Sequence, residues 1–298
     1  NQRANNVELS AQSSGGIVST IVSASLAGAV GIGGGGALSI GAGFAKNVIG
    51  TRDAIANPND AAEVKAYSQN THINASDDIS IAARSTQSIG SVVVAGSVAI
   101  SGGGIAALSG AGAGTQVEYQ IFGAVEAYID GDGANGIQAD RLSLSADDLS
   151  TIKAIAVAAA LAISVAPTPS GVGVSVAIAA TIANNEIGNF VNASIRNASN
   201  VTASAGNTSL SGIAISAQQA AKNESVAVSA AIAAAVAPIA SSFSGAGTCA
   251  INTITSVIIA SIEDSVSVTS GGAIDITADS DSSISSRNAA AALSASHV

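Results

Sequence analysis

A short acidic loop is the first candidate for chemistry in this sequence. Residues 130–136 read Asp-Gly-Asp-Gly-Ala-Asn-Gly, and Asp130, Asp132 and Asn135 supply side-chain oxygens. Hard oxygen ligands at alternate positions suit Ca²⁺, but Ala134 stands where an EF-hand loop needs its fifth-position ligand. We favour a solvated acidic turn and no bound metal, and keep this loop as a weak calcium candidate.

Several further carboxylates are grouped along the chain. Asp275, Asp279 and Asp281 form a second acidic patch with a weak claim to Ca²⁺. Glycosidases need two opposed carboxylates, whereas neighbours on a strand point to opposite faces. We therefore expect no catalytic residue among the adjacent pairs. These pairs are Asp77–Asp78, Asp147–Asp148 and Glu263–Asp264.

The other motifs with chemical potential are isolated. Gly31, Gly33 and Gly36 satisfy G-x-G-x-x-G, but no strand–helix–strand unit surrounds them, so dinucleotide binding is not expected. His72 lies in a polar loop and His297 near the terminus, and neither is accompanied by a nucleophile and an acid. The sequence predicts no cofactor.

One cysteine and six glycosylation sequons complete the inventory. Cys249 stands alone in a run of small residues, so no internal disulfide forms and we expect a buried, inert thiol. Asn-x-Ser/Thr sequons arise by chance in a chain so rich in these residues, and glycans depend on export by a suitable host. The sequons begin at Asn74, Asn192, Asn197, Asn200, Asn207 and Asn223.

Composition excludes several classes of protein. Among 298 residues only 10% are charged and 2% aromatic, the net charge is −10, and the mean hydropathy is +0.48. A hydrophobic chain is not disordered, and an acidic one does not bind nucleic acid through a basic patch. Four uncharged runs exceed the ~20 residues of a membrane-spanning helix, but their periodicity is not helical and we expect no membrane insertion. The runs are 9–45, 85–117, 154–185 and 225–262.

Apolar side chains alternate with small ones over long stretches. In 154–166 and 225–237 every second residue is mostly Val, Ile or Leu, and those between are Ala or Ser. Period 2 over such lengths predicts β-strands. We expect the large face to form ladders that fill the core, so that Val157→Asp would bury a charge. The predicted ladder residues are Ile155, Val157, Leu161, Ile163, Val165, Val226, Val228 and Ile232.

The strands belong to a longer repeat. One landmark, VELSA, ISIAA, LSLSA, IAISA and IDITA, recurs at intervals of 72, 63, 71 and 61 residues. Units that cannot close their own core stack on their neighbours. We predict an all-β fold, a parallel β-helix-like β-solenoid of about 4.5 repeats of ~61–72 residues with about four strands each. This single array, a segment of a larger protein or a filament subunit, divides approximately into 1–60, 61–124, 125–190, 191–256 and 257–298.

The recurring scheme V-x-A-Y/S-I, I-S-I-x-A and G-A-G resembles the repeats of very large bacterial surface proteins of the leukotoxin-like filamentous adhesin family. The resemblance covers the whole chain. It implies secretion, a β-helical stalk, and an adhesive or filament-forming role at the cell surface. It carries over no catalytic residue.

These observations together predict a structural, extracellular or cell-surface protein that is not an enzyme. Its expected partner is itself, through end-to-end or lateral assembly, with a host or cell-surface ligand as a further partner. One alternative is a binding module that recognises a host protein or a carbohydrate through the loops 51–60 and 130–136. A second is a polysaccharide lyase of the β-helix type.

Overall fold

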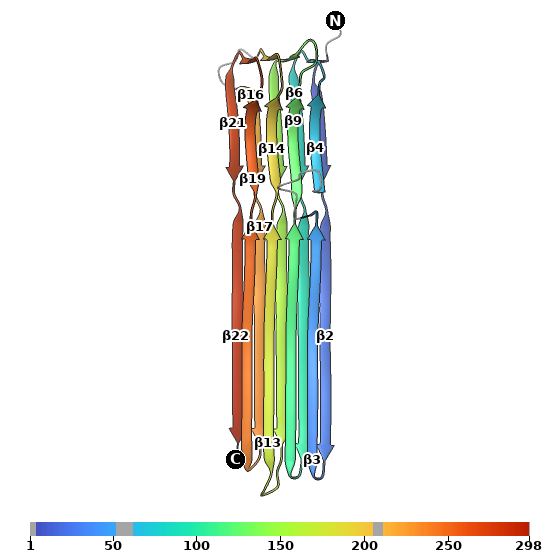
Figure 1. Ribbon diagram of the computed structural model, residues 1–298, viewed down its shortest axis with the longest axis vertical. Helices are drawn as coiled ribbons and strands as arrows, with labels where there is room; N and C mark the ends of the chain where they lie inside the picture. Colours follow the sequence, from blue (N-terminus) through green and yellow to red (C-terminus); the bar gives the residue numbers. More distant parts are fainter. Residues whose placement is uncertain (1–3, 52–61, 205–210, 298) are drawn as a thin grey trace.

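A computed structural model describes residues 4–51, 62–204 and 211–297. All regular secondary structure in these residues is β-strand. The strands run along the long axis of an elongated slab (Figure 1). Within the described residues, we find no helix with the length and apolar character that crossing a membrane requires.

The chain winds in coils that repeat the same five strands in the same order. The first coil comprises β1 (Val7–Ser13), β2 (Gly16–Gly31), β3 (Gly34–Ile49), β4 (Ala62–Gln69) and β5 (Ile73–Asn74). The second comprises β6 (Asp78–Ser85), β7 (Ser88–Gly103), β8 (Ala106–Ile121), β9 (Gly123–Asp130) and β10 (Ile137–Ala139).

The later coils follow the same plan. The third comprises β11 (Arg141–Asp148), β12 (Thr151–Val165), β13 (Val172–Ile187), β14 (Phe190–Arg196) and β15 (Val201–Ala203). The fourth comprises β16 (Ser211–Gln219), β17 (Lys222–Val236), β18 (Ile239–Ile254), β19 (Val257–Glu263) and β20 (Val268–Ser270). A final half-coil holds β21 (Ala273–Ser280) and β22 (Ser283–His297).

Equivalent strands of successive coils pair in parallel and in register. The sheets are β1-β6-β11-β16-β21, β2-β7-β12-β17-β22, β18-β13-β8-β3, β19-β14-β9-β4 and β20-β15-β10-β5. Val7, Ile79, Leu142, Ile213 and Ile274 are successive partners. Their spacing equals that of the sequence landmark, which confirms a parallel β-solenoid with one wide coil per repeat. Each full coil adds to the four expected strands a fifth of only two or three residues.

The slab has two halves that meet at a waist (Figure 1). In the short-strand half, the β1-β6-β11-β16-β21 sheet faces the β19-β14-β9-β4 sheet. In the long-strand half, the β2-β7-β12-β17-β22 sheet faces the β18-β13-β8-β3 sheet. We call the links between the two halves the waist; it includes residues 149–150, 188–189 and 220–221.

The short-strand half has a conventional apolar core. The repeated landmark turns Ile79, Ile81, Leu142 and Leu144 inward, where each is at most 2% exposed. Valines and isoleucines of the facing sheet, such as Ile129, complete the cluster. Each buried side chain of this size contributes about 1.5–3 kcal/mol, so this half holds much of the hydrophobic stabilisation.

Toward its tip the long-strand half is packed with alanine instead, whereas next to the waist its core also holds larger side chains such as Val93, Tyr119 and Ile152. Ala156, Ala158, Ala160 and Ala162 of β12 point inward and are at most 4% exposed. The predicted ladder residues point outward and are half-buried or exposed, so the prediction that the large face fills the core is wrong for this half. Those residues are Ile155, Val157, Leu161, Ile163, Val165, Val226, Val228 and Ile232.

The close approach of the two long sheets explains this inversion. A Cβ atom on Gly41 would lie 2.2 Å from the carbonyl oxygen of Gly96 in the facing sheet. The Thr181 hydroxyl donates to the carbonyl of Val228 across the gap at 2.9 Å. Only small side chains fit between backbones this close, and three of the four tip links span just two residues. A charge at Val157 would therefore not enter the core.

The ladders themselves are present on the outer face. Val94, Val157 and Val228 are aligned in register, as are Val98, Leu161 and Ile232. Each ladder side chain covers part of its neighbours in adjoining coils, which removes apolar area from water without a facing sheet.

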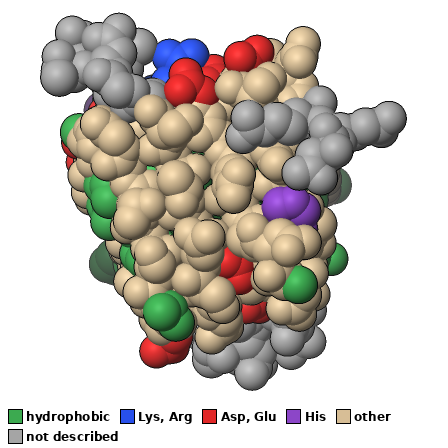
Figure 2. Space-filling model, turned by 90° about the horizontal axis from the view of Figure 1, so that it is seen from above, with side chains coloured by type: hydrophobic (Ala, Val, Ile, Leu, Met, Phe, Trp, Pro, Cys, Tyr) green, Lys and Arg blue, Asp and Glu red, His purple; other side chains and the backbone are tan. Residues whose placement is uncertain are grey.

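Charge is distributed unevenly along the slab. In the long strands, the Lys, Arg, Asp and Glu residues cluster toward the waist, and the part toward the tip has none. They are Lys46, Glu118, Lys153, Glu186, Lys222, Glu224 and Arg287. A view onto the end of the short-strand half shows acidic groups there, with hydrophobic side chains mainly along the flanks (Figure 2).

Candidate functional site

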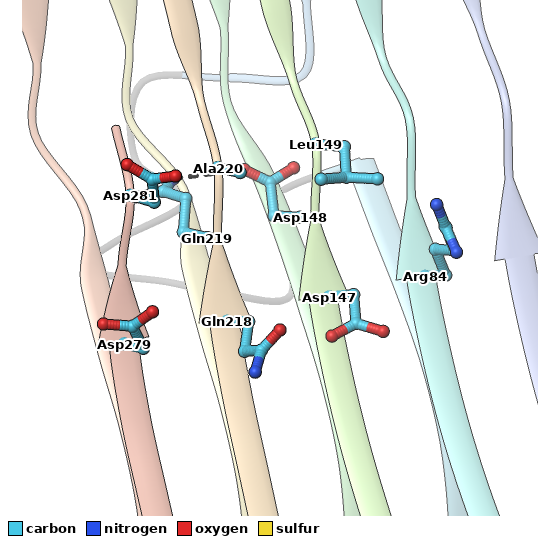
Figure 3. A pocket seen from close by; sticks show the side chains of 9 residues that line it. All are labelled: Arg84, Asp147, Asp148, Leu149, Gln218, Gln219, Ala220, Asp279 and Asp281. Atoms are coloured by element: carbon cyan, nitrogen blue, oxygen red, sulfur yellow. Dashed lines mark hydrogen bonds between the residues drawn. The ribbon is translucent and has the colours of Figure 1, made fainter. Parts of the chain in front are cut away.

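A polar cluster surrounds a recess of about 340 Å³ at the waist. Its side chains come from β6, β11, β16 and β21 and the links that follow them (Figure 3). The lining residues are Arg84, Asp147, Asp148, Leu149, Gln218, Gln219, Ala220, Asp279 and Asp281.

Strand alternation sorts this cluster into two rows. Arg84, Asp147, Gln218 and Asp279 stack in register on the outer face. The next position on each strand forms the inner row, in which Asp148 stands between Ser85 and Gln219. The two carboxylates of the Asp147–Asp148 pair therefore point apart, as alternation predicts.

Asp148 is held inside the waist by three neutral donors and is 1% exposed. Ser150 Oγ donates to Oδ1 at 2.6 Å, Asn189 Nδ2 to Oδ2 at 2.6 Å and Gln219 Nε2 to Oδ2 at 3.1 Å. Gln219 belongs to the next coil, and Asn189 crosses from the opposite layer. Because a buried carboxylate requires such compensation, this network pins two coils and two layers together.

Two of the carboxylates at the recess are already hydrogen-bonded within the protein. Asp148 faces the interior, and the Asp147 carboxylate accepts a hydrogen bond from Ser145 at 3.1 Å. No three His, Cys, Asp or Glu side chains in the described segments are placed to hold a metal ion. The hydrogen bonds of Asp148 show that this cluster holds neighbouring coils in position.

The first calcium candidate, Asp130, is engaged by its neighbouring coil. Asn197 Nδ2 donates to Oδ1 at 2.7 Å, and Arg196 Nε lies 3.4 Å from Oδ2. The Arg196 guanidinium also lies 4.4 Å from the centroid of the Tyr128 ring, which stacks on Tyr67 at 5.0 Å. These contacts tie three coils together on the outer face of β4, β9 and β14.

Asp132 has a similar role between coils and is 2% exposed. Burial alone would raise the pKa of this carboxyl, but backbone N–H groups of Ser199 and Asn200 hold the pKa below its usual value. Asn135, the third calcium candidate, is exposed in the turn. The side chains of Asp130 and Asp132 thus use protein donors from the next coil, and the loop acts as a junction between coils.

The corner that contains this loop requires a left-handed backbone, which sequence reasoning missed. The residue after each of the strands β4, β9, β14 and β19 has a positive φ: 47° at Asn70, 75° at Gly131, 54° at Asn197 and 47° at Asp264. Glycine, asparagine and aspartate are the residues that adopt this conformation most readily. The recurrence of Gly, Asn or Asp at this one position of the repeat could have predicted the left-handed corner.

The remaining carboxylate pairs are also separated. Asp78 is bound by Arg141 through two hydrogen bonds of 2.9 and 2.7 Å, and these bonds lower the pKa of Asp78. Glu263 accepts a hydrogen bond from Ser261 at 2.6 Å, whereas Asp264 forms the corner. These residues work in turns and between coils.

The isolated residues take structural positions. His72 Nδ1 lies 2.5 Å from the carbonyl oxygen of Gly136, and His297 ends β22. Gly31 ends β2, Gly33 lies in the tip link and Gly36 is the third residue of β3. Cys249 is exposed on β18, so the prediction of a buried thiol is wrong.

Two of the predicted glycosylation sequons are buried, and the first predicted binding loop lies almost entirely outside the described residues. Asn223 is 0% and Asn192 6% exposed, so neither accepts a glycan in the folded chain. Asn207, and all of loop 51–60 except Thr51, lie outside the described residues.

No protein-family model matches this chain, and no curated protein or solved structure is significantly similar to it.

Proposed function

We propose that this chain is a structural β-solenoid segment of an extracellular filament, sheath or adhesin stalk, and that it is not an enzyme. The observation that carries the proposal is the parallel, in-register stacking of every strand class across the coils. Backbone hydrogen bonds then run along the coil axis, the direction in which a filament bears load. The resemblance to surface-protein repeats supports the extracellular setting.

Edge strands give the array a means of growth. The strands β1 to β4 lie at one edge of their sheets, and β18, β19, β21 and β22 lie at the other. Unpaired edges are templates for another chain, and both edges present parallel strands of matching length. A further coil of the same chain continues the array with the register that the internal coils already use. Another copy that pairs its β1 and β2 with β21 and β22 adds coils in that register and leaves one strand position open in each of the three four-stranded sheets.

Electron microscopy of the purified chain at neutral pH tests this proposal. We expect threads that lengthen with protein concentration because copies add end to end. Discrete particles one chain long at every concentration would contradict self-assembly by this route.

A pair of variants in β2 sharpens the test. Ala27 points inward at the open edge and pairs with Ala99, whereas Ala24 points outward. In Ala27→Lys the ammonium reaches water through the open edge of one copy but would be buried when another coil is added. We expect Ala27→Lys to fold and to stop thread growth, and Ala24→Lys to form threads. Equal growth of both variants would contradict pairing at this edge.

A further inference from the structure

The outer face of the β18-β13-β8-β3 sheet carries an extended apolar surface. Large side chains from all four strands are more than a third exposed there. They are Leu38, Ile40, Phe44, Leu108, Val176, Ile178, Ile182, Ile239, Phe243 and Ile251. A single soluble domain rarely exposes a contiguous patch of this kind unless a partner covers it.

This face has ridges and grooves that alternate from coil to coil. Along β8, Gly110, Gly112 and Gly114 form a trough one strand wide. It is flanked on one side by Leu38 and Ile40 of β3, which pair with the first two glycines. Two recesses open over β8 between its neighbouring strands, so the trough is a true groove.

The flanking strand β13 is the second ridge. Val176 and Ile178 pair with Gly110 and Gly112 and rise on the other side of the groove. The next strand, β18, lowers the surface again at Gly245, the partner of Ile178. At the level of Ile40, Gly112 and Ile178 the order across the face is ridge, groove, ridge, groove, with ridges about 9.6 Å apart because strands are spaced about 4.8 Å. Two residues earlier, Phe243 of β18 stands beside Val176 and closes the second groove.

We propose that a second copy of this chain docks on this face, related by a two-fold axis parallel to the strands. Such an axis keeps the strand direction and reverses the coil order. The β13 ridge of each copy then faces the β8 groove of the other, and β3 faces β18. Ile178 lies opposite Gly112 and Ile40 opposite Gly245 in this isologous contact, while Leu38 meets Phe243.

The other outer face of the long-strand half has a different relief. Val22, Val94, Val157 and Val228 form a row of similar size in successive coils, whereas Gly90 lies between Val18 and Lys153 in another row. The recess over Gly90 is bordered by the charged side chain of Lys153. The recesses over β8 are lined by uncharged residues, which favours the β18-β13-β8-β3 face for apolar contact with a copy of the same chain.

The size and border of this face fit a stable interface. Four strands of 16 residues cover roughly 1,000 Å² in plan, against about 800 Å² per partner in a standard interface. Charged groups lie at its waist border, where Lys46 Nζ is 3.0 Å from Glu118 Oε1. An apolar centre with a polar rim is the usual anatomy of a protein interface.

This inference rests on the proposed structural function, which it deepens by naming a lateral contact. The test uses the full chain carrying Ala27→Lys, so that end-to-end growth does not obscure lateral pairing. Sedimentation velocity compares this background with added Gly112→Asp, or with added Gly96→Asp on the opposite face. A Cβ atom at either glycine lies 3.9 Å or more from its nearest neighbour, so both chains have room to fold, which circular dichroism verifies.

We expect the background to be a dimer, Gly112→Asp to raise its dissociation constant at least ~100-fold, and Gly96→Asp to leave it unchanged. A monomeric background, equal effects of the two substitutions, or binding of the background to phosphatidylcholine vesicles in place of dimerisation would overturn the inference. If the wild-type chain forms no threads but the dimer is present and is weakened by Gly112→Asp, the result would contradict end-to-end assembly and leave the lateral contact supported.

Discussion

Individual polar residues hold coils and layers in place. Asp148 shows this best, because its three donors come from its own link, the next coil and the opposite layer. Asp147 precedes it on the same strand yet faces outward. Sequence alone did not distinguish the two carboxylates, since the partner Asn189 lies 41 residues along the chain.

Replacing Asp148 by alanine leaves buried donors without their acceptor. We expect a loss of about 2–4 kcal/mol in the free energy of unfolding, measured by urea denaturation. The matched change Asp147→Ala, on the outer face, should cost no more than about 0.5 kcal/mol. Similar losses for both would show that the buried network does not stabilise the waist.

Asp132 gives a pH-dependent test at the same scale. Its pKa is lower in the folded chain, so its contribution is present above the unfolded pKa of about 3.9 and is lost as pH falls through the folded pKa. We expect Asp132→Asn to be less stable than wild type at pH 7 and the difference to shrink upon acidification. A constant difference between Asp132→Asn and wild type would refute the assignment.

At the scale of the strand, the sequence was informative about periodicity and misleading about direction. Period-2 alternation predicted the long strands and the landmark spacing predicted their register. We assigned the large face to the core because apolar side chains usually lie inside. The charged residues near the strand ends indicated the correct direction. Lys153 lies on the same face of its strand as Ile155, and Glu224 on the same face as Val226, so these faces are exposed to water.

Two adjacent alanines in β12 test which face is inside. Ala158 is 0% exposed between the sheets, whereas Ala159 is on the outer surface. We expect Ala158→Leu to lower the free energy of unfolding by about 3 kcal/mol or more through overpacking, and Ala159→Leu to change it by less than about 1 kcal/mol. A larger loss of unfolding free energy for Ala159→Leu than for Ala158→Leu in chemical denaturation would mean that the large side chains face the core.

At the scale of the whole molecule, a coil is the unit of construction. Residues 79–141 span one coil, because Asp78 pairs with Arg141 and Ile79 with Leu142. Repeating these 63 residues in tandem should give a folded chain one coil longer. Small-angle scattering should show the slab extended by about 4.8 Å along the coil axis, with a higher thermal midpoint, since nearest-neighbour contacts sum along such arrays. An unfolded or molten product would contradict this modular construction.

X-ray diffraction from aligned threads of the wild-type chain tests most directly whether coils stack along the filament. If coils stack along the filament, the ~4.8 Å reflection lies parallel to the thread axis. The alanine-packed long sheets should add an equatorial spacing well below the ~10 Å of ordinary stacked sheets. A ~4.8 Å reflection perpendicular to the thread axis would mean that the strands run along the filament, and a filament built by coil stacking would then be excluded.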